Sequence, residues 1–496
     1  MADDTSAIVN KVTSMSNYLY SDGVSYNDYL EQITCMLFLK MVDEKSKVSS
    51  SSLALPDGCS WEDLRDLKGT DLEDKYKSIL DELSKSGGLL GEIYSGSQNR
   101  INAPATLRKL YDMIGEVNWS TLSDDVKGVI YEGLLAKNAE DTKSGAGQYF
   151  TPRPLIRAIV EVMRPRKGQK ICDPACGSGG FLLAAKQYIL EHEGADLDRD
   201  DKKFLKTEAF RGYELVKATY RLCLMNMFLH GIGDLNGSVP IICQDSLLQL
   251  PSERYDMVLA NPPFGTKSAL KSVNDEGKEF VEDGMYSRQD FWVSTSNKQV
   301  NFVQHINSIL KADGRAAIVV PDNVLFDSVA STVRRKLLQT CRLHTILRLP
   351  TGIFYRPGVK ANVIFFDRMP AGEGVWTKDI WVYDLRTNKH FTLKQKPMKF
   401  EDLSEFIECF HADNIADRKE TYSEDNPDGR FRRYTAKDIL DTDDCRLDLK
   451  WIKDDSAIDL DELGDPLELI EQYKLEVQEY SKKVLEILDQ ISKELE

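Results

Sequence analysis

The sequence contains little that would bind a metal ion or a nucleoside triphosphate. Its six histidines are dispersed and its nine cysteines form no Cys-x-x-Cys pair, so a metal site has no support. It also lacks a Gly-x-x-x-x-Gly-Lys-[Ser/Thr] phosphate-binding loop. That absence argues against an ATP-driven motor in this chain.

Long apolar runs and a leader sequence are missing as well. No apolar run approaches the roughly 18 residues that a membrane span needs. The first residues, Met1 to Asp4, lack the basic and apolar regions of a signal peptide. Scattered cysteines in so long a chain indicate reduced, mostly buried thiols. We therefore expect a cytoplasmic protein with no membrane contact.

Positive charge is also scarce, because 64 Lys and Arg residues stand against 80 Asp and Glu residues, for a net charge of −16. Proteins bind DNA largely by displacing counterions from phosphates with Lys and Arg. Unless its basic residues gather on one face, this chain should bind DNA poorly by itself. Its 42% hydrophobic content is that of a globular protein, and 496 residues predict two or three domains.

The first part of the chain is predicted to be helical. Apolar residues recur at helical spacing, and no convincing strand occurs before about residue 168. The predicted helices cover residues 6–20, 27–48, 61–86, 104–116 and 123–138. We interpret residues 1–140 as a helical domain whose apolar stripes form a core.

From about residue 169, predicted strands alternate with predicted helices. The strands are 169–172, 208–213, 239–243, 255–260, 315–320, 343–349, 362–367 and 380–385. The helices are 153–164, 178–192, 217–230, 300–311 and 328–340. This alternation predicts an α/β fold with a parallel sheet covered on both faces. In such sheets, ligands bind outside the C-terminal ends of the strands.

An unusual tetrapeptide follows the apolar strand 255–260. Asn261-Pro262-Pro263-Phe264 has two prolines that remove backbone donors and hold the chain rigidly. The carbonyls of Asn261 and Pro262 are then left without a sheet partner. Two fixed acceptors beside an aromatic ring would clamp an exocyclic amine on a flat ring. A turn with a core aromatic is the alternative interpretation of these residues. The residues that follow, 265–300, form a long polar stretch that we expect to be a loop.

Acidic or glycine-rich segments follow three further strands. The loop after the first strand begins at Asp173 and continues Pro174-Ala175-Cys176-Gly177-Ser178-Gly179-Gly180-Phe181. Its glycines permit close approach of the backbone to a ligand, and its leading acid suits a cationic ligand better than a pyrophosphate. Glu214, after the second strand, could accept both hydroxyls of a ribose. Asp245, after the third, could accept from an adenine amino group.

The segment between the helical part and the sheet is rich in small and polar residues. Residues 141–147 lead into Gln148-Tyr149-Phe150-Thr151, where paired aromatic residues follow a flexible stretch. This composition is typical of a segment that folds over a ligand. A plain domain linker explains it nearly as well.

These motifs together resemble those of S-adenosylmethionine-dependent DNA amino-methyltransferases. More closely, the chain resembles the modification subunit of a type I restriction-modification system, and the resemblance covers nearly its whole length. The motifs that carry it are Gly147 to Arg153, Asp173 to Leu182 and Asn261 to Phe264, with weaker support from Gly314 to Pro321 and Leu349 to Phe354.

The resemblance implies a Rossmann-like, S-adenosylmethionine-dependent methyltransferase sheet with an assigned cofactor pocket. Phe150 and Thr151 would line that pocket, with Gln148 and Tyr149 beside them. The loop from Asp173 and Ala175 through Gly177, Ser178, Gly179, Gly180 and Phe181 would wrap the methionine end. Glu214 would bind the ribose and Asp245 the adenine of the cofactor. Asn261, Pro262 and Phe264 would hold a flipped target adenine.

The implied chemistry suits these residue types. The N6 lone pair of adenine is delocalised into the ring, and acceptors at Asn261 and Pro262 would favour a more pyramidal nitrogen. Phe264 would stack on the extruded base. Methylation of cytosine C5 needs a cysteine after a proline, and no Pro-Cys pair exists. N4-cytosine or protein-glutamine methylation, and a non-catalytic scaffold of the same fold, remain alternatives.

The end of the chain is predicted to associate with a partner. Apolar residues keep a 3–4 spacing after Pro466, which is typical of a coiled-coil seam; they are Ile470, Tyr473, Val477, Tyr480, Val484, Ile487 and Ile491. We expect a catalytic domain over residues 141–460 and an association helix over 466–496. The resemblance implies DNA contacted through a complex with a specificity subunit, a second copy of this subunit and a restriction subunit.

Overall fold

The computed structural model describes most of the chain. The described residues are 2–48, 55–122, 151–234, 237–264, 269–273, 279–283, 285–354, 359–372, 374–393 and 395–454. By the clustering of its contacts the chain divides into a large unit, residues 1–386 with 390–450, and a small one, residues 387–389 with 451–496. The predicted helix 123–138 and the C-terminal seam lie outside the described residues.

The N-terminal part is helical, as the sequence predicts. Its helices are α1 (Ala2–Ser21), α2 (Tyr26–Val48), α3 (Gly69–Ser84), α4 (Gly88–Tyr94) and α5 (Pro104–Gly115), with 3-10 turns η1 (Glu62–Leu64) and η2 (Trp119–Thr121). Pro104 begins α5 at a position where its missing N–H costs nothing. One expected helix, 61–86, is divided into η1 and α3, because the chain turns at Gly69 with a φ of +59°.

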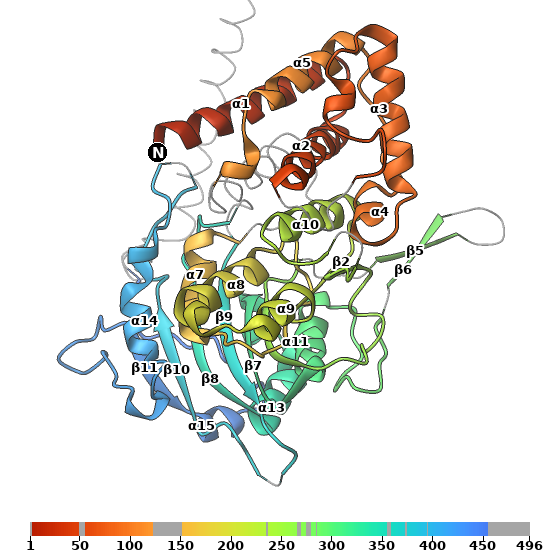
Figure 1. Cartoon of the computed structure of the whole chain (residues 1–496). Helices are drawn as coiled ribbons and strands as arrows, with labels where there is room; N and C mark the ends of the chain where they lie inside the picture. The colour runs from red at the N-terminus through yellow and green to blue at the C-terminus, as the bar shows by residue number, and fades with distance from the viewer. Residues whose placement is uncertain are drawn as a thin grey trace, which may run out of the picture. The chain divides into compact units, whose positions relative to one another are not determined.

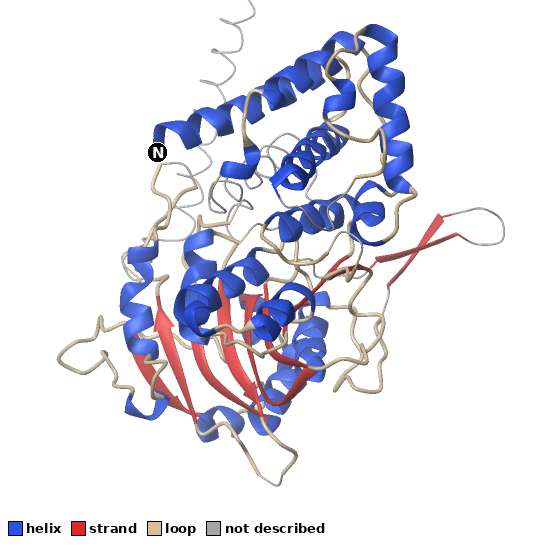
Figure 2. Cartoon of the chain, viewed as in Figure 1, coloured by secondary structure: helices blue, strands red, loops and turns tan. Residues whose placement is uncertain are grey.

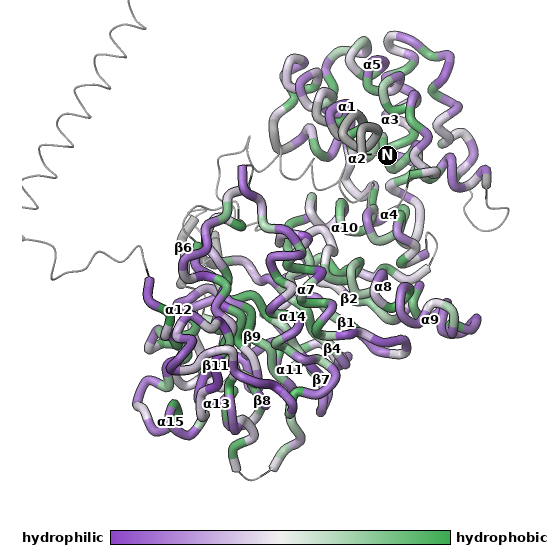
Figure 3. The backbone as a smooth tube through the Cα atoms, turned by 90° about the vertical axis from the view of Figure 1, so that its left-hand side faces the viewer, coloured by the Kyte–Doolittle hydropathy of each residue, from purple (hydrophilic) through white to green (hydrophobic). Residues whose placement is uncertain are grey.

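A nine-stranded sheet forms the centre of the α/β part, in the order β11-β10-β8-β9-β7-β4-β1-β2-β3 (Figure 1). Its strands are β1 (Ile171–Asp173), β2 (Phe210–Glu214), β3 (Ile241–Cys243), β4 (Tyr255–Ala260), β7 (Leu310–Pro321), β8 (Cys341–Arg348), β9 (Ala361–Arg368), β10 (Asp379–Asp384) and β11 (Phe431–Thr435). The central strands β4 and β9 are mostly apolar and almost fully buried, and Figure 3 shows hydrophobic residues running along them. Such strands must be buried on both faces.

Helices lie on both faces of this sheet (Figure 2). Helices α7 (Arg153–Met163) and α8 (Gly180–Glu193) pack against one face, and α10 (Lys217–Leu229) packs on β2 and β3. Helices α11 (Lys298–Ile309) and α13 (Ser331–Thr340) pack on β7 and β8 from the other face. Smaller elements complete the fold: η3 (Gly194–Asp196), α9 (Arg199–Thr207), α12 (Asp322–Phe326), η4 (Ser328–Ala330), η5 (Phe400–Leu403), α14 (Ser404–Phe410), η6 (Ile415–Asp417) and α15 (Ala436–Leu440).

The predicted α/β class is confirmed, but the prediction of a parallel sheet is wrong for two strands. β9 pairs antiparallel with both β7 and β8, and β11 pairs antiparallel with β10. An apolar strand buried on both faces has the same pattern whichever way it runs, so sequence periodicity does not reveal its direction. The remaining neighbours pair in parallel.

The region 265–300 differs from its expected form. It contains a separate two-stranded antiparallel sheet, β5 (Ala269–Val273) with β6 (Glu279–Asp283), where a long polar loop is predicted. An isolated bridge then joins Tyr286 to Thr295 before α11 begins. Strands of five residues carry only a short pattern, which is why their sequence does not stand out from a loop. Among the described residues, no helix is long and apolar enough to cross a membrane.

Candidate active site

The end of β4 places the side chain of Asn261 in a buried position. β4 lies between β1 and β7 in the middle of the sheet, and Asn261 is the first residue after it. Its side-chain Nδ2 donates to Thr151 Oγ1 over 2.8 Å. Its Oδ1 is buried and accepts no hydrogen bond from the residues that the structure describes. A buried acceptor left over in this way is costly unless a ligand satisfies it.

The aromatic ring of the same tetrapeptide is also held in place. Phe264 is 6% exposed and meets Phe354 edge to face, with ring centroids 5.6 Å apart and an interplanar angle of 81°. This T-shaped arrangement is a favoured geometry for aromatic pairs. Phe354 belongs to the segment Leu349 to Phe354 that follows β8. The pair therefore joins the ends of two different strands.

Asp173 ends β1 and is almost fully buried. Burial raises the pKa of Asp173 to about 8, although the Ala175 N–H donates to its Oδ1 over 3.0 Å and lowers the pKa in part. The carboxyl group of Glu214 adds to the rise. Burial makes this carboxyl group resist ionisation. A cation bound beside it would stabilise the ionised form.

The glycine loop takes conformations that glycine allows. Gly177 and Gly179 have φ values of +52° and +85°, and Gly179 is the N-cap residue immediately before α8. A Cβ on Gly179 would lie 3.1 Å from the sulfur atoms of both Cys223 and Met227 on α10. The loop therefore packs closely on α10, and a side chain at this position would push it away.

Glu214, at the end of β2, is bonded to the same loop. Its Oε2 accepts from the Gly177 N–H over 3.1 Å and its Oε1 from the Val216 N–H over 2.8 Å. Burial raises the pKa of Glu214, and these backbone donors offset part of the rise. Each carboxylate oxygen has a second lone pair, so both can still accept from a ligand hydroxyl.

Asp245 follows β3 and is only partly buried. Its Oδ1 accepts from the Leu247 N–H over 2.9 Å, and its Oδ2 accepts from the Tyr286 hydroxyl over 2.6 Å. Ala175 of the glycine loop packs against the small apolar cluster that contains Tyr286 and Leu247. Tyr286 lies in the region expected to be a polar loop, and the sequence gives no signal for this contact.

Asn226 on α10 is a second residue that sequence reasoning missed. It is 5% exposed, and its Nδ2 donates to the Ser178 carbonyl over 2.9 Å. Its Oδ1 is buried and accepts no bond from any residue in the described part of the chain. An asparagine inside the otherwise apolar run Leu222 to Leu229 is a signal that could have revealed it.

The predicted site residues are thus brought together only in part. Asp173, Gly177 and Glu214 meet at one loop, and Thr151 contacts Asn261. Phe181 instead lies in the hydrophobic core, and Gly180 opens α8. Gln148, Tyr149 and Phe150 lie outside the described residues. No cluster of three metal-ligating side chains occurs among the described residues.

These side chains suit a ligand with a cationic end and a ribose. The buried Asp173 carboxyl group favours a positive charge nearby, and Glu214 keeps lone pairs for two hydroxyls. The glycine loop offers backbone rather than side chains to such a ligand. A flat amine at the adjacent strand end would meet the unsatisfied Asn261 Oδ1.

Comparison with known families agrees with this arrangement. Residues 122–442 match the model of the N-6 DNA methylase family, and residues 8–115 match the HsdM N-terminal domain. The first match covers more than half of the chain. The chain belongs to the N-6 DNA methylase family.

Several relatives of this methylase are named as methylase subunits of type I restriction enzymes. It is 37% identical to the StySJI methylase subunit of Salmonella typhimurium LT2, over 92% of this chain and 90% of that protein. It is 36% identical to the EcoKI methylase subunit of Escherichia coli K12 over the same shares. The crystal structure of the EcoKI M protein aligns over 90% of each chain with a TM-score of 0.54 and 32% identity.

The family expected from the sequence motifs is confirmed for this methylase. It is a type I modification subunit of the adenine-specific DNA methyltransferase class. The crystal structure of a modification subunit from Vibrio vulnificus YJ016 also aligns, with a TM-score of 0.69, 25% identity and 88% of this chain covered. The shared fold places the acidic and amide residues described above at the C-terminal ends of β1, β2, β3 and β4.

Proposed function

We propose that this methylase transfers a methyl group from S-adenosylmethionine to N6 of an adenine flipped out of DNA. The observation that carries the proposal is the Asn261 side chain. Its amide nitrogen is occupied by Thr151 Oγ1 at 2.8 Å, while its buried oxygen accepts from no described residue. The amide is thus oriented with its acceptor available for a ligand amine.

The residues that would hold the cofactor lie at the C-terminal ends of β1, β2 and β3. Asp173 would face its cationic end, Glu214 the ribose and Asp245 the adenine, with the loop from Ala175 to Gly180 supplying backbone. Tyr286 already bonds Asp245 over 2.6 Å and would orient that carboxylate. When bound, S-adenosylmethionine supplies a methyl group activated by its sulfonium charge. Gln148, Tyr149 and Phe150 stay predictions for the same pocket.

The chain's own residues then bind and orient the acceptor base. Asn261 Oδ1 and the Pro262 carbonyl accept the two hydrogens of the adenine N6 group, which directs its lone pair out of conjugation. Phe264, fixed by Phe354, stacks on the base and offsets part of the few kcal/mol that unstacking costs. No covalent intermediate with the protein is needed. Positioning supplies most of the rate.

A division of the chain into domains and a set of partner subunits belong to the same proposal. We propose a helical domain over residues 1–140, a catalytic domain over 141–460 and an association helix over 466–496. The methylase would work with a specificity subunit, a second copy of itself and a restriction subunit, in the cytoplasm where the DNA lies. The type I subunits among its relatives support this assembly.

The substitution Asn261→Ala tests the proposal directly. It removes the acceptor that faces the amine but leaves the residues at β1, β2 and β3 in place. We expect methyl transfer to be lost while S-adenosylmethionine binding, measured by calorimetric titration, changes little. Loss of cofactor binding with residual transfer would contradict the role. Product analysis after labelled transfer separates N6-adenine from N4-cytosine or glutamine products.

A further inference from the structure

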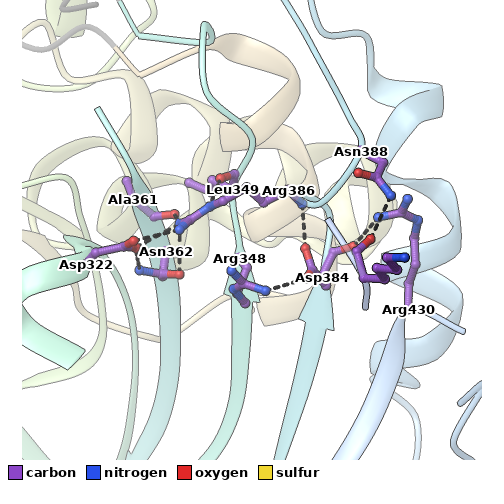
Figure 4. A network of polar contacts seen from close by, with 10 residues as sticks. Asp322, Arg348, Leu349, Ala361, Asn362, Asp384, Arg386, Asn388 and Arg430 are labelled. Atoms are coloured by element: carbon purple, nitrogen blue, oxygen red, sulfur yellow. Dashed lines mark hydrogen bonds and ion pairs between the residues drawn. The ribbon is translucent and has the colours of Figure 1, made fainter. Parts of the chain in front are cut away.

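The side chain of Arg386 binds several groups at the C-terminal edge of the sheet, the edge at which Asn261 also follows its strand. Arg386 follows β10, and its guanidinium is largely buried. It donates to Leu349 O at 2.7 Å, Ala361 O at 2.6 Å, Asn362 Oδ1 at 3.2 Å and both carboxylate oxygens of Asp322 at 2.7 and 2.9 Å (Figure 4). Only a planar guanidinium has enough donors for this set.

Two of these acceptor carbonyls lie at the two ends of the connection between β8 and β9. Leu349 immediately follows β8, Ala361 begins β9, and the Leu349 N–H also donates to the Ala361 carbonyl over 3.0 Å. Arg386 therefore ties together the two ends of the segment that joins β8 to β9. Phe354, 3% exposed, lies on that segment and contacts Phe264.

The guanidinium is itself anchored to the centre of the sheet. Asp322 follows β7, the neighbour of β4, and Asn362 Nδ2 donates to Asp322 Oδ1 over 2.8 Å. Burial would raise the pKa of Asp322, but hydrogen bonds and charge from Arg386 outweigh it and hold the pKa below its usual value. The carboxylate is then charged at neutral pH. This pairing fixes Arg386 relative to the strand beside Asn261.

The described part of this segment also packs against a neighbouring backbone. Gly352 has a φ of +81°, and a Cβ there would lie 2.0 Å from the Phe391 carbonyl oxygen. Ile353 is buried next to it. Arg386 at Leu349 and the backbone of Phe391 at Gly352 therefore hold the described residues 349–354, which include Phe354.

We propose that Arg386 is a positioning residue for base capture. It holds the two ends of the connection, at Leu349 and Ala361, so that Phe354 fixes the ring plane of Phe264. This inference rests on the proposed function, in which Phe264 stacks on the extruded adenine. The side chain of Arg386 bonds to none of the residues assigned to the base or to the cofactor, so it would act through Leu349 and Ala361.

The first test is Arg386→Lys in the complex with the specificity subunit. Lysine keeps the charge opposite Asp322 but cannot reach both carbonyls and the carboxylate together. We expect the KM for DNA to rise about ten-fold, and the fluorescence of 2-aminopurine at the target position to fall. The affinity for S-adenosylmethionine should not change. An unchanged KM with unchanged fluorescence would overturn the proposal.

A matched control is Arg335→Lys on α13. Arg335 also donates to backbone carbonyls, those of Leu440 and Thr442 at 2.7 Å, but at a different part of the fold. Its replacement should leave the KM for DNA and the fluorescence as in the wild type. If both variants change DNA binding equally, the effect is general loosening and the proposal fails.

A double-mutant cycle with Phe354→Ala separates positioning from general stability. If Arg386 acts through Phe354, adding Arg386→Lys to Phe354→Ala should raise the KM for DNA little further. Additive effects would refute the coupling. Should Arg386→Lys fail to fold, Asp322→Asn, which loosens the same anchor, provides the cycle instead. Asn261→Ala in parallel identifies a failure of the proposed function, because transfer would then survive without the acceptor.

Discussion

The hydrogen bond between Asn261 and Thr151 gives each of these residues a defined orientation. A hydroxyl can donate or accept, whereas an amide has one donor end and one acceptor end. With Nδ2 directed at Thr151 Oγ1, the acceptor Oδ1 faces the other way and is buried without a described partner. Thr151, expected in the cofactor pocket, therefore also touches the residue proposed to bind the target amine.

Replacing Thr151 by valine should slow methyl transfer. Thr151→Val keeps the shape but leaves the buried Asn261 amide without its partner, at a cost of about 1–3 kcal/mol. We expect kcat to fall about 10- to 100-fold, while Thr151→Ser, which keeps the hydroxyl, retains most activity. Single-turnover kinetics with saturating cofactor measures both. A weaker cofactor affinity with normal kcat would assign Thr151 to the cofactor pocket alone.

Asp173 makes stability depend on pH in the absence of cofactor. Its pKa is about 8 in the folded chain, against 3.8 for an ordinary Asp. Between these values the folded chain keeps a proton that the unfolded chain has lost. The free energy of unfolding therefore falls as pH rises from about 4 to about 8.

The variant Asp173→Asn isolates this effect. It does not titrate, so its Tm relative to the wild type should increase as pH rises through that window and then level off. Differential scanning calorimetry of both proteins without cofactor measures the difference. A constant difference in Tm across the window would show that Asp173 ionises at its ordinary pKa.

At the scale of the element, α10 connects the glycine loop to the N-terminal helices. On one side Asn226 binds the Ser178 carbonyl. On the other, Arg221 donates to Glu31 Oε2 on α2 over 2.6 Å, and the Tyr220 hydroxyl donates to Glu92 Oε2 on α4 over 3.0 Å. The helix is nearly all buried, so its polar contacts fix its rotation as well as its position.

Removing the Asn226 contact should weaken cofactor binding more than catalysis. Asn226→Ala frees the Ser178 carbonyl and loosens the loop, and we expect the Kd for S-adenosylmethionine to rise about ten-fold. The kcat at saturating cofactor should change little. Isothermal titration gives the affinity, and Leu224→Val is the control, because Leu224 is buried on the same helix two residues from Asn226 and therefore on its opposite side. Equal losses in the two variants would rule out a specific role for Asn226.

At the scale of the whole molecule, charge limits what the chain does alone. A net charge of −16 opposes association with DNA, and the type I relatives are named as subunits. We predict that the isolated methylase binds S-adenosylmethionine but shows little site-specific methylation. Adding the specificity subunit should restore it, as measured by labelled methyl transfer to duplexes with and without the site. Robust specific methylation by the isolated chain would contradict this dependence.

The sequence by itself determined the features that are local. The strand 255–260, the rigid Asn261-Pro262-Pro263-Phe264 after it and the glycine loop after Asp173 follow from apolar runs, proline geometry and glycine, which act over a few residues. Only the tertiary structure decided which distant groups meet. Thr151 and Asn261 are 110 residues apart, Arg386 binds carbonyls on a different connection, and β9 runs against its neighbours. Such pairings depend on how strands are ordered in the sheet, and a local pattern of residues carries no record of that order.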